Sequence, residues 1–201
     1  MNKFNLSASK IIIIFSILSL VALFSCNQKA TKKTIELNDG WEFYFEETDK
    51  WYPANVPGNI HTDLFKNDLI PDPFYSTNED SLQWISSRKW HYRKEFTIAK
   101  LFYNRNLEIV FDGIDTYCDI ILNGDTIGHT SNMYRQWIFP IADSIKKETN
   151  KLELIFYPSE LKNLEFAQEK GYAIPDDRVF TRKAPYQYGW DWAPKMETCG
   201  I

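Results

Sequence analysis

The stretch "TYCDIILNGDTIGHT" at residues 116–130 decides the fold class, because it has the pattern of two β-strands joined by a tight turn. Cys118, Ile120 and Leu122 occupy every second position, which places their side chains on one face of a strand. Asn123-Gly124 is the dipeptide that suits a two-residue type I′ turn. The stretch therefore predicts a β-hairpin with one apolar face.

Strand character continues on both sides of this hairpin, where apolar and polar residues alternate between turn residues. Within 33–45, Asn38-Asp39-Gly40 predicts a turn between two strands. The stretches with this character are "KTIELNDGWEFYF" (33–45), "WHYRKEFTI" (90–98), "NLEIVFDGI" (106–114) and "KLELIFYP" (151–158).

Helical patterns are sparse. Residues 58–69 predict a short helix, and 159–171 predict another, with Ser159 as its N-cap and Gly171 as its end. The stretch 70–89 is predicted to be a long loop. Many short strands with long connections favour an all-β fold, a jelly-roll β-sandwich with one or two short helices, whose loops carry the function.

The first 25 residues have the pattern of an export signal. Lys3 and Lys10 precede the apolar run 11–24, which is too short for a comfortable bilayer span. The sequence "LFSC" that follows resembles the lipobox of bacterial lipoproteins, in which the cysteine, here Cys26, is lipidated. A non-cleaved anchor or an ordinary signal is the alternative. We expect an exported protein, held by lipid at Cys26 to a bacterial membrane on its periplasmic or cell-surface side.

The remaining chain divides into a short tether and one folded body. Residues 26–34 are polar and lack hydrophobic periodicity, and 35–201 are enough for one domain with its own core. A (β/α)₈ barrel typically needs about 250 residues, so the body is too short for one.

Charge and composition narrow the function classes. The chain has a net charge of −4, which becomes −6 without the two lysines of the signal, and no Lys/Arg-rich run is present. This balance argues against a nucleic-acid partner. The three histidines are scattered, so we expect neither a metal nor a cofactor. Cys118 and Cys199 could pair, but buried free thiols are the preferred interpretation.

Several stretches, taken in their order along the chain, resemble the β-mannosidases of glycoside hydrolase family two. The pieces "IPDPFY", "QWI" and "YGWDWAP" are particular to that branch, whereas the hairpin type "DGIDTYCDIILNG" is shared with other members. The resemblance covers about 35–201, and these are the stretches that carry it: "VPGNIHTDLFKNDLIPDPFYSTNEDSLQWI" (56–85), "WHYRKEF" (90–96), "FDGIDTYCDIILNGDTIG" (111–128), "NMYRQW" (132–137) and "RKAPYQYGWDWAP" (182–194).

The resemblance implies that the body is the N-terminal, galactose-binding-like domain of such an enzyme. Family members are retaining exo-glycosidases that remove terminal β-mannose from oligosaccharides or glycans, using two glutamates about 5–5.5 Å apart. In the family both glutamates lie on a (β/α)₈ barrel that follows an immunoglobulin-like domain. We therefore assign no catalytic residue in this chain. We expect those two domains as partners within the same protein.

The chain stops at "METCGI", where family members continue, so we expect a domain truncated at its C-terminal end. Two alternatives stay open. The first is a self-standing carbohydrate-binding lipoprotein without catalytic activity. The second is a lipoprotein whose sandwich binds another protein.

The segment "YQYGWDWAP" (186–194) has the chemistry of a sugar site. An indole face covers the apolar C–H face of a sugar, and a carboxylate accepts hydrogen bonds from two hydroxyls. Gly189 permits an unusual turn before Trp190. The resemblance implies that Trp190 and Asp191 bind the mannose, with Asp191 providing orientation rather than proton transfer.

Neighbouring residues have competing interpretations. Arg182 could pair with Asp191, contact the barrel or contact the sugar. For Trp192, a core or interface position is preferred over a sugar platform. The adjacent acids Asp176 and Asp177 are interpreted as solvated or turn residues rather than as a catalytic pair.

Two further acids lie in "DTYCD" (115–119), which we place on one strand. Asp115 and Asp119 are interpreted as sheet-edge or cross-strand partners.

Overall fold

The computed structural model describes residues 33–103, 105–171 and 177–201. Contacts divide the chain into two units, Met1–Glu36 and Leu37–Ile201, and the second unit contains every helix and strand described below. The predicted signal and its Cys26 lie outside the described residues. The domain boundaries predicted for this N-terminal part remain predictions.

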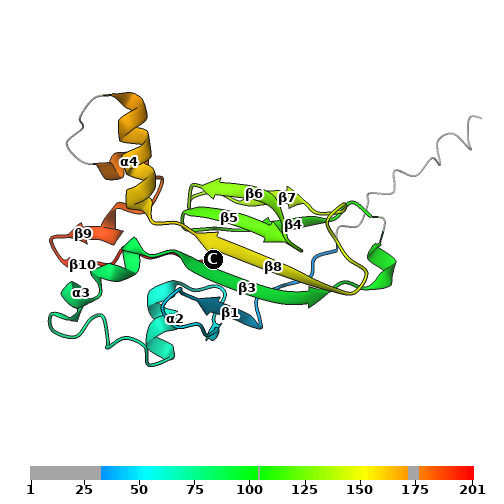
Figure 1. The fold of residues 1–201 in the computed structure, drawn as a ribbon, viewed down its shortest axis with the longest axis horizontal. Coiled ribbons are helices and arrows are strands. Elements are labelled where there is room, and N and C mark those ends of the chain that lie inside the picture. The colour runs from blue at the N-terminus through cyan, green and yellow to red at the C-terminus, as the bar shows by residue number, and fades with distance from the viewer. Residues whose placement is uncertain (1–32, 104, 172–176) are drawn as a thin grey trace, which may run out of the picture. The chain divides into compact units, whose positions relative to one another are not determined.

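The body is a β-sandwich of two antiparallel sheets (Figure 1). The larger sheet has six strands in the order β2-β1-β3-β8-β5-β6, and the smaller pairs β4 with β7. Their bounds are β1 (Trp41–Tyr44), β2 (Tyr52–Ala54), β3 (Trp90–Thr97), β4 (Glu108–Phe111), β5 (Tyr117–Leu122), β6 (Asp125–Ser131), β7 (Trp137–Pro140) and β8 (Thr149–Phe156). The predicted all-β sandwich is confirmed.

The hairpin that decides the fold class forms as expected from its sequence. Asn123 and Gly124 both have positive φ, at 57° and 98°, as a type I′ turn requires. Cys118, Ile120 and Leu122 are all buried on the inner face of β5. The predicted hairpin and its apolar face are confirmed.

The smaller sheet packs against β6 through a glycine. A Cβ at Gly128 would lie 2.0 Å from a ring carbon of Phe139, so only a residue without a side chain fits there. Phe139 in turn packs edge-on against Phe111, with ring centroids 6.4 Å apart. The close approach at Gly128 therefore brings β7 onto the core.

Three α-helices and four 3₁₀ turns complete the described body. They are α2 (Ile60–Lys66), α3 (Asn78–Ser81), α4 (Ser159–Lys170), η1 (Gln83–Ser87), η2 (Lys100–Phe102), η3 (Asp177–Phe180) and η4 (Pro185–Gln187). The end of α4 at Gly171, with φ of 69°, confirms the prediction. Two further predictions are corrected here. Ser159 is the first residue of α4 rather than its N-cap, which is Pro158, and no side chain caps that end. The predicted loop 70–89 contains both α3 and η1.

The strand predicted before the turn at Asn38-Asp39-Gly40 is wrong, because residues 33–38 form no strand. The indole nitrogen of Trp41 donates to the carbonyl oxygen of Leu37 at 2.6 Å. Both neighbours of β1 in the sheet are already provided by β2 and β3. Residues 33–38 therefore cannot pair with β1 as an additional strand.

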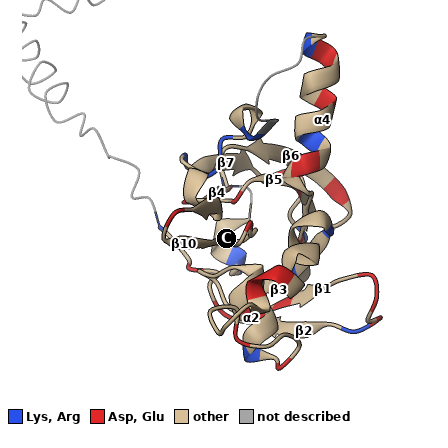
Figure 2. Cartoon of the chain, turned by 90° about the vertical axis from the view of Figure 1, so that its left-hand side faces the viewer, with Lys and Arg blue, Asp and Glu red and all other residues tan. Residues whose placement is uncertain are grey.

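Basic and acidic residues are interspersed along the elements in the view of Figure 2, and residues of both signs lie on α4. The described part of the chain contains no helix both long and apolar enough to cross a membrane. Helix α4, α3 and a second hairpin, β9 (Tyr188–Trp190) with β10 (Ala193–Lys195), lie at one end of the sandwich (Figure 1). This end carries the candidate site.

Candidate functional site

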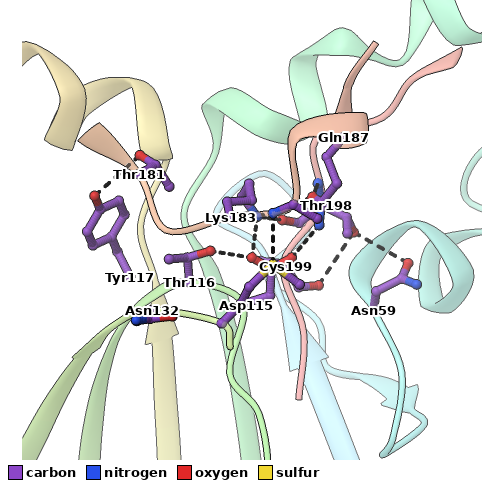
Figure 3. Close-up of polar contacts among 12 residues, drawn as sticks. Asn59, Asp115, Thr116, Tyr117, Asn132, Thr181, Lys183, Gln187, Thr198 and Cys199 are labelled. Atoms are coloured by element: carbon purple, nitrogen blue, oxygen red, sulfur yellow. Dashed lines mark hydrogen bonds and ion pairs between the residues drawn. The ribbon is translucent and has the colours of Figure 1, made fainter. Parts of the chain in front are cut away.

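The segment 181–201 builds the site in two parts: a buried junction at its base and an exposed hairpin at its tip. It passes through η4, turns back between β9 and β10, and ends between α2 and the start of β5. We call the polar residues at the base the junction: the buried Lys183 and Gln187 and the partly buried Asp115 and Thr198, all labelled in Figure 3.

A buried ion pair lies at the centre of the junction. The ammonium of Lys183 lies 2.5 Å from Oδ1 of Asp115, and only 2% of the Lys183 side chain is exposed. The same ammonium donates to the carbonyl oxygen of Thr198 at 2.5 Å and to Oε1 of Gln187 at 3.2 Å. Three acceptors therefore surround the buried charge, as the cost of removing it from water requires.

Gln187 links the two sides of this ion pair. Its amide nitrogen donates to Oδ2 of Asp115 at 2.7 Å, and its Oε1 accepts from the backbone N–H of Thr198 at 3.0 Å. Thr116 donates its hydroxyl to Oδ1 of Asp115. Both oxygens of the Asp115 carboxylate are thus satisfied within the protein.

Backbone hydrogen bonds hold residues 199–201 in place beside the junction. Ile60 N–H donates to the carbonyl oxygen of Cys199 at 2.9 Å, and Gly200 exchanges two hydrogen bonds with Asp115, at 3.0 and 3.2 Å. A Cβ at Gly200 would lie 2.1 Å from the carbonyl oxygen of Gly58, a backbone atom. The segment fits here only because position 200 is glycine.

Burial shifts the pKa values of two groups beside the junction, His61 and Glu197. Burial first, and then the nearby Lys183 ammonium, lower the pKa of His61 to about 4. The neutral His61 ring lies 3.0 Å, through Nδ1, from the hydroxyl of Thr198. Burial also raises the pKa of Glu197, an effect that Lys183 partly offsets. The neutral form of His61 is thus favoured beside a charge that already has its own counter-ion.

The junction leaves little space for a ligand. The cavity that Asp115, Lys183 and Glu197 help to line holds about 20 Å³. That volume is roughly enough for one or two water molecules and far below the 300 Å³ or more of a ligand pocket. The junction therefore holds the segment together rather than binding a sugar.

The hairpin above it presents its two tryptophans to solvent. Trp190 pairs with Ala193, so Asp191 and Trp192 form the turn. Trp190 is 50% exposed and Trp192 81%, and their rings lie 5.8 Å apart at an interplanar angle of 59°. Gly189 has φ of 93°, which a residue with a side chain rarely adopts, so the unusual backbone conformation predicted for it is present, but it lies within β9 and the turn follows Trp190.

The turn combines two chemical features of sugar-binding sites. Two indole rings offer apolar faces, and the exposed carboxylate of Asp191 between them in sequence can accept hydrogen bonds from hydroxyl groups. Among the ion pairs of the described residues, none involves Asp191. Its carboxylate is therefore available to an incoming ligand.

The structure separates the predicted site residues. Trp190, Asp191 and Trp192 come together at the hairpin turn, which excludes a core position for Trp192 in this unit. The side chain of Arg182 is exposed. The backbone carbonyl oxygen of Arg182 accepts a hydrogen bond from the backbone N–H of Met133 at 3.0 Å. Within the described parts of the chain no ion pair joins Arg182 to Asp191.

The acids considered in the sequence have different surroundings. Asp119 lies opposite His129 in the β5–β6 pairing and 2.6 Å from its Nδ1, which confirms the cross-strand interpretation. For Asp115 that interpretation is wrong, because this residue precedes β5 and forms the buried pair with Lys183. Asp176 and the side chain of Asp177 lie outside the described residues.

Sequence reasoning missed three members of the junction: Lys183, Gln187 and Thr198. Asp115 lies 68 residues from Lys183 along the chain, so no local spacing reveals the pair. The one available signal is a lysine, Lys183, followed directly by Ala184 and Pro185 rather than by polar residues. That signal is too general to indicate burial.

Cys118 and Cys199 are both buried free thiols, as preferred from the sequence. Burial raises the pKa of each thiol well above its usual range. Over the described ranges, His, Cys, Asp and Glu form no group of three or more that could hold a metal ion.

Several known proteins are similar to this chain in sequence, and one solved structure is also similar in fold. The β-mannosidase B of Thermothelomyces thermophilus is 34% identical over 180 residues, which are 85% of this chain and 21% of that protein. The β-mannosidase of Mus musculus is 30% identical over 198 residues, covering 92% of this chain and 22% of its own length. The crystal structure of the β-D-mannosidase from Dictyoglomus thermophilum superposes with a TM-score of 0.79 at 40% identity, covering 84% of this chain and 22% of that one.

This chain thus spans about a fifth of the length of the relatives it matches. The family described as glycosyl hydrolase 2 galactose-binding domain-like matches residues 41–201, which include both sheets, the junction and the hairpin. The chain belongs to the glycosyl hydrolase 2 galactose-binding domain-like family.

Proposed function

We propose that this chain is the N-terminal sugar-binding domain of a β-mannosidase, in which it helps to bind a terminal β-D-mannose residue. One observation carries the proposal: an exposed aspartate, Asp191, lies at a hairpin turn, flanked in sequence by two exposed tryptophans. The similarity to proteins named β-mannosidases supports the choice of mannoside over other sugars.

In this proposal the chain supplies binding and orientation, not proton transfer. Asp191 accepts hydrogen bonds from two sugar hydroxyls, and Trp190 covers the C–H face of the ring. Holding the ring at its hydroxyl side fixes the reacting carbon relative to groups elsewhere in the enzyme. The two glutamates of the retaining reaction would come from the barrel domain that the family resemblance implies.

The base of the hairpin suits this role. Lys183, Asp115 and Gln187 lock the segment below the turn through bonds that are shielded from water. Binding groups act best when a rigid support holds them in place before the ligand arrives. The buried junction is such a support, and the exposed turn is the part free to meet a sugar.

Substituting Asp191 in the native gene product tests the proposal. We expect Asp191→Ala to lower kcat/KM for p-nitrophenyl β-mannoside by about 100-fold, because it removes two hydrogen bonds to a charged group. Asp125→Ala is the matched control, since Asp125 is also an exposed aspartate beside a two-residue hairpin turn. It should leave kcat/KM unchanged.

Each outcome decides between functions. Wild-type kcat/KM in Asp191→Ala would refute the assignment of Asp191. A native product that binds mannosides in titration calorimetry without hydrolysing them would instead support the self-standing carbohydrate-binding protein. Hydrolysis of β-glucuronides or β-galactosides in preference to β-mannosides would refute the substrate class.

We also infer from the sequence that the protein is exported and lipidated at Cys26. Metabolic labelling with radioactive palmitate tests this inference. The label should be incorporated into the wild-type protein and lost in Cys26→Ala. An unlabelled wild-type protein would contradict lipidation.

A further inference from the structure

The hairpin has a second support besides the junction, provided by the α3–η1 region. Figure 1 shows α3 beside β10. The backbone N–H of Lys195, in β10, donates to Oε1 of Glu79 at 2.6 Å. The carbonyl oxygen of Lys195 accepts from the side-chain amide of Gln83 at 2.8 Å. Both backbone polar groups of one residue are therefore held by side chains more than 100 positions away in sequence.

The Gln83 side chain also bonds to the backbone of Glu79, the residue that carries the other supporting side chain. Its amide nitrogen has two protons, and the second is donated to the carbonyl oxygen of Glu79 at 3.0 Å. Glu79 lies in α3 and Gln83 begins η1, so one amide group joins the helical region to the strand. We call the two side chains, Glu79 and Gln83, the clamp.

The clamp acts on a hairpin that has little stability of its own. β9 and β10 have three residues each, and among the described strands each pairs only with the other. A two-stranded hairpin of this length is marginal in water. The junction holds the segment before and after the hairpin, while the clamp is attached to β10 itself, three positions from the turn residue Trp192.

We propose that Glu79 and Gln83 are positioning residues that fix the direction of the hairpin and so the placement of Trp190 and Asp191. The inference rests on the proposed function, because it assigns the clamp a role at the same mannose-binding turn. Without the clamp, the hairpin samples several directions, and only a fraction of molecules has the turn in place. The apparent dissociation constant rises by the inverse of that fraction.

This mechanism predicts a particular kinetic signature. Once the sugar is bound, its own contacts hold the turn in place, so Glu79→Ala should raise KM for p-nitrophenyl β-mannoside about threefold to tenfold while kcat changes little. A merely structural role would lower the amount of folded enzyme and would reduce the apparent kcat without changing KM. The KM-against-kcat split separates the two roles.

The experiment combines kinetics with hydrogen exchange on the native gene product. In Glu79→Ala, the peptide that covers residues 188–195 should exchange about tenfold faster than in the wild type, since the Lys195 amide loses its acceptor. Glu79→Gln keeps a side-chain oxygen at the same place and should restore most of both the KM and the protection. Asp80→Ala is the matched control, because Asp80 is an exposed acid of the same helix, and its backbone N–H donates to the carbonyl oxygen of the N-cap residue Thr77 rather than to the hairpin.

Every outcome bears on the clamp. Unchanged exchange in Glu79→Ala would overturn it, as would faster exchange with an unchanged KM, or an equal effect in Asp80→Ala. If Asp191→Ala impairs hydrolysis while Glu79→Ala changes neither KM nor exchange, the clamp fails and the proposed function stands. If Asp191→Ala has wild-type activity, the proposed function fails and the positioning role fails with it.

Discussion

The junction and the hairpin turn come from the same segment of chain, yet they differ in almost every physical property. In the junction, Lys183 is buried, only 13% of the Asp115 side chain is exposed, and both charged groups have hydrogen-bond partners within the protein. At the turn, Asp191 and Trp192 are exposed, and the described residues form no ion pair with Asp191. The contrast shows that two parts of one segment can have different roles. The base contributes to stability, and the exposed turn is free to bind a ligand.

The largest expected effect is on the stability of the junction. Lys183→Met removes the buried ammonium and leaves the Asp115 carboxylate without its counter-ion. We expect the free energy of unfolding, measured by urea denaturation, to fall by about 3–5 kcal/mol. This substitution tests whether the junction really carries the stability.

Lys162→Met is the matched control, because it breaks an exposed pair with Glu165, 2.8 Å apart. Its cost should stay below about 1 kcal/mol. Equal costs for the two lysine variants would show that burial does not distinguish the junction.

A smaller loss of stability is expected from Gly200→Ala. The added Cβ would meet the carbonyl oxygen of Gly58 and the Cα of Asn59, at 2.1 and 2.8 Å, and backbone atoms cannot move aside easily. We expect the free energy of unfolding to fall by about 1–3 kcal/mol. Gly113→Ala controls for the loss of a glycine, since a Cβ there lies 3.7 Å from its nearest neighbour outside the adjacent residues. A Gly200→Ala variant as stable as Gly113→Ala would contradict the tight fit.

The pH dependence of stability should change in His61→Asn. The pKa of His61 is about 4 in the folded protein, against an ordinary value of 6.5. As the pH falls from 6.5 to 4, the unfolded chain therefore binds a proton that the folded protein does not, and stability is lost. Below about pH 4 both states are protonated and this loss stops growing.

Urea denaturation at a series of pH values measures this contribution. The wild type should lose up to about 3 kcal/mol more than His61→Asn over that range. Asp63 and Glu197, whose pKa values are raised by burial, act in the opposite direction. Both proteins retain these acids, so their effect cancels in the difference. Parallel pH profiles would show that His61 is not held neutral.

The smallest effect on stability is expected at the turn. Trp192→Ala removes a side chain that is 81% exposed, so the free energy of unfolding should change by less than about 0.5 kcal/mol. Binding of mannosides by the native product, measured by calorimetry, should weaken instead. If Trp192→Ala lowered the free energy of unfolding as much as Lys183→Met, the turn would contribute to stability as the junction does, and the contrast between them would be wrong.

Local patterns predicted the elements that are stabilised locally. The Asn123-Gly124 turn, the buried face of β5 and the end of α4 at Gly171 all follow from the conformations their own residues favour. Predictions failed where a distant partner decides the outcome. Residues 33–38 have strand-like alternation, but β2 and β3 already occupy both sides of β1.

Within the candidate site, the sequence by itself determined the chemical character of the turn. Trp190, Asp191 and Trp192 are adjacent in the chain, so their combination of apolar faces and a carboxylate is visible without any structure. Only the tertiary structure decided what holds that turn in place. Lys183 meets Asp115, and Lys195 meets Glu79, across 68 and 116 positions of chain. Such contacts form because the folded sandwich brings those positions together, and the sequence alone does not indicate which groups far apart in the chain will meet.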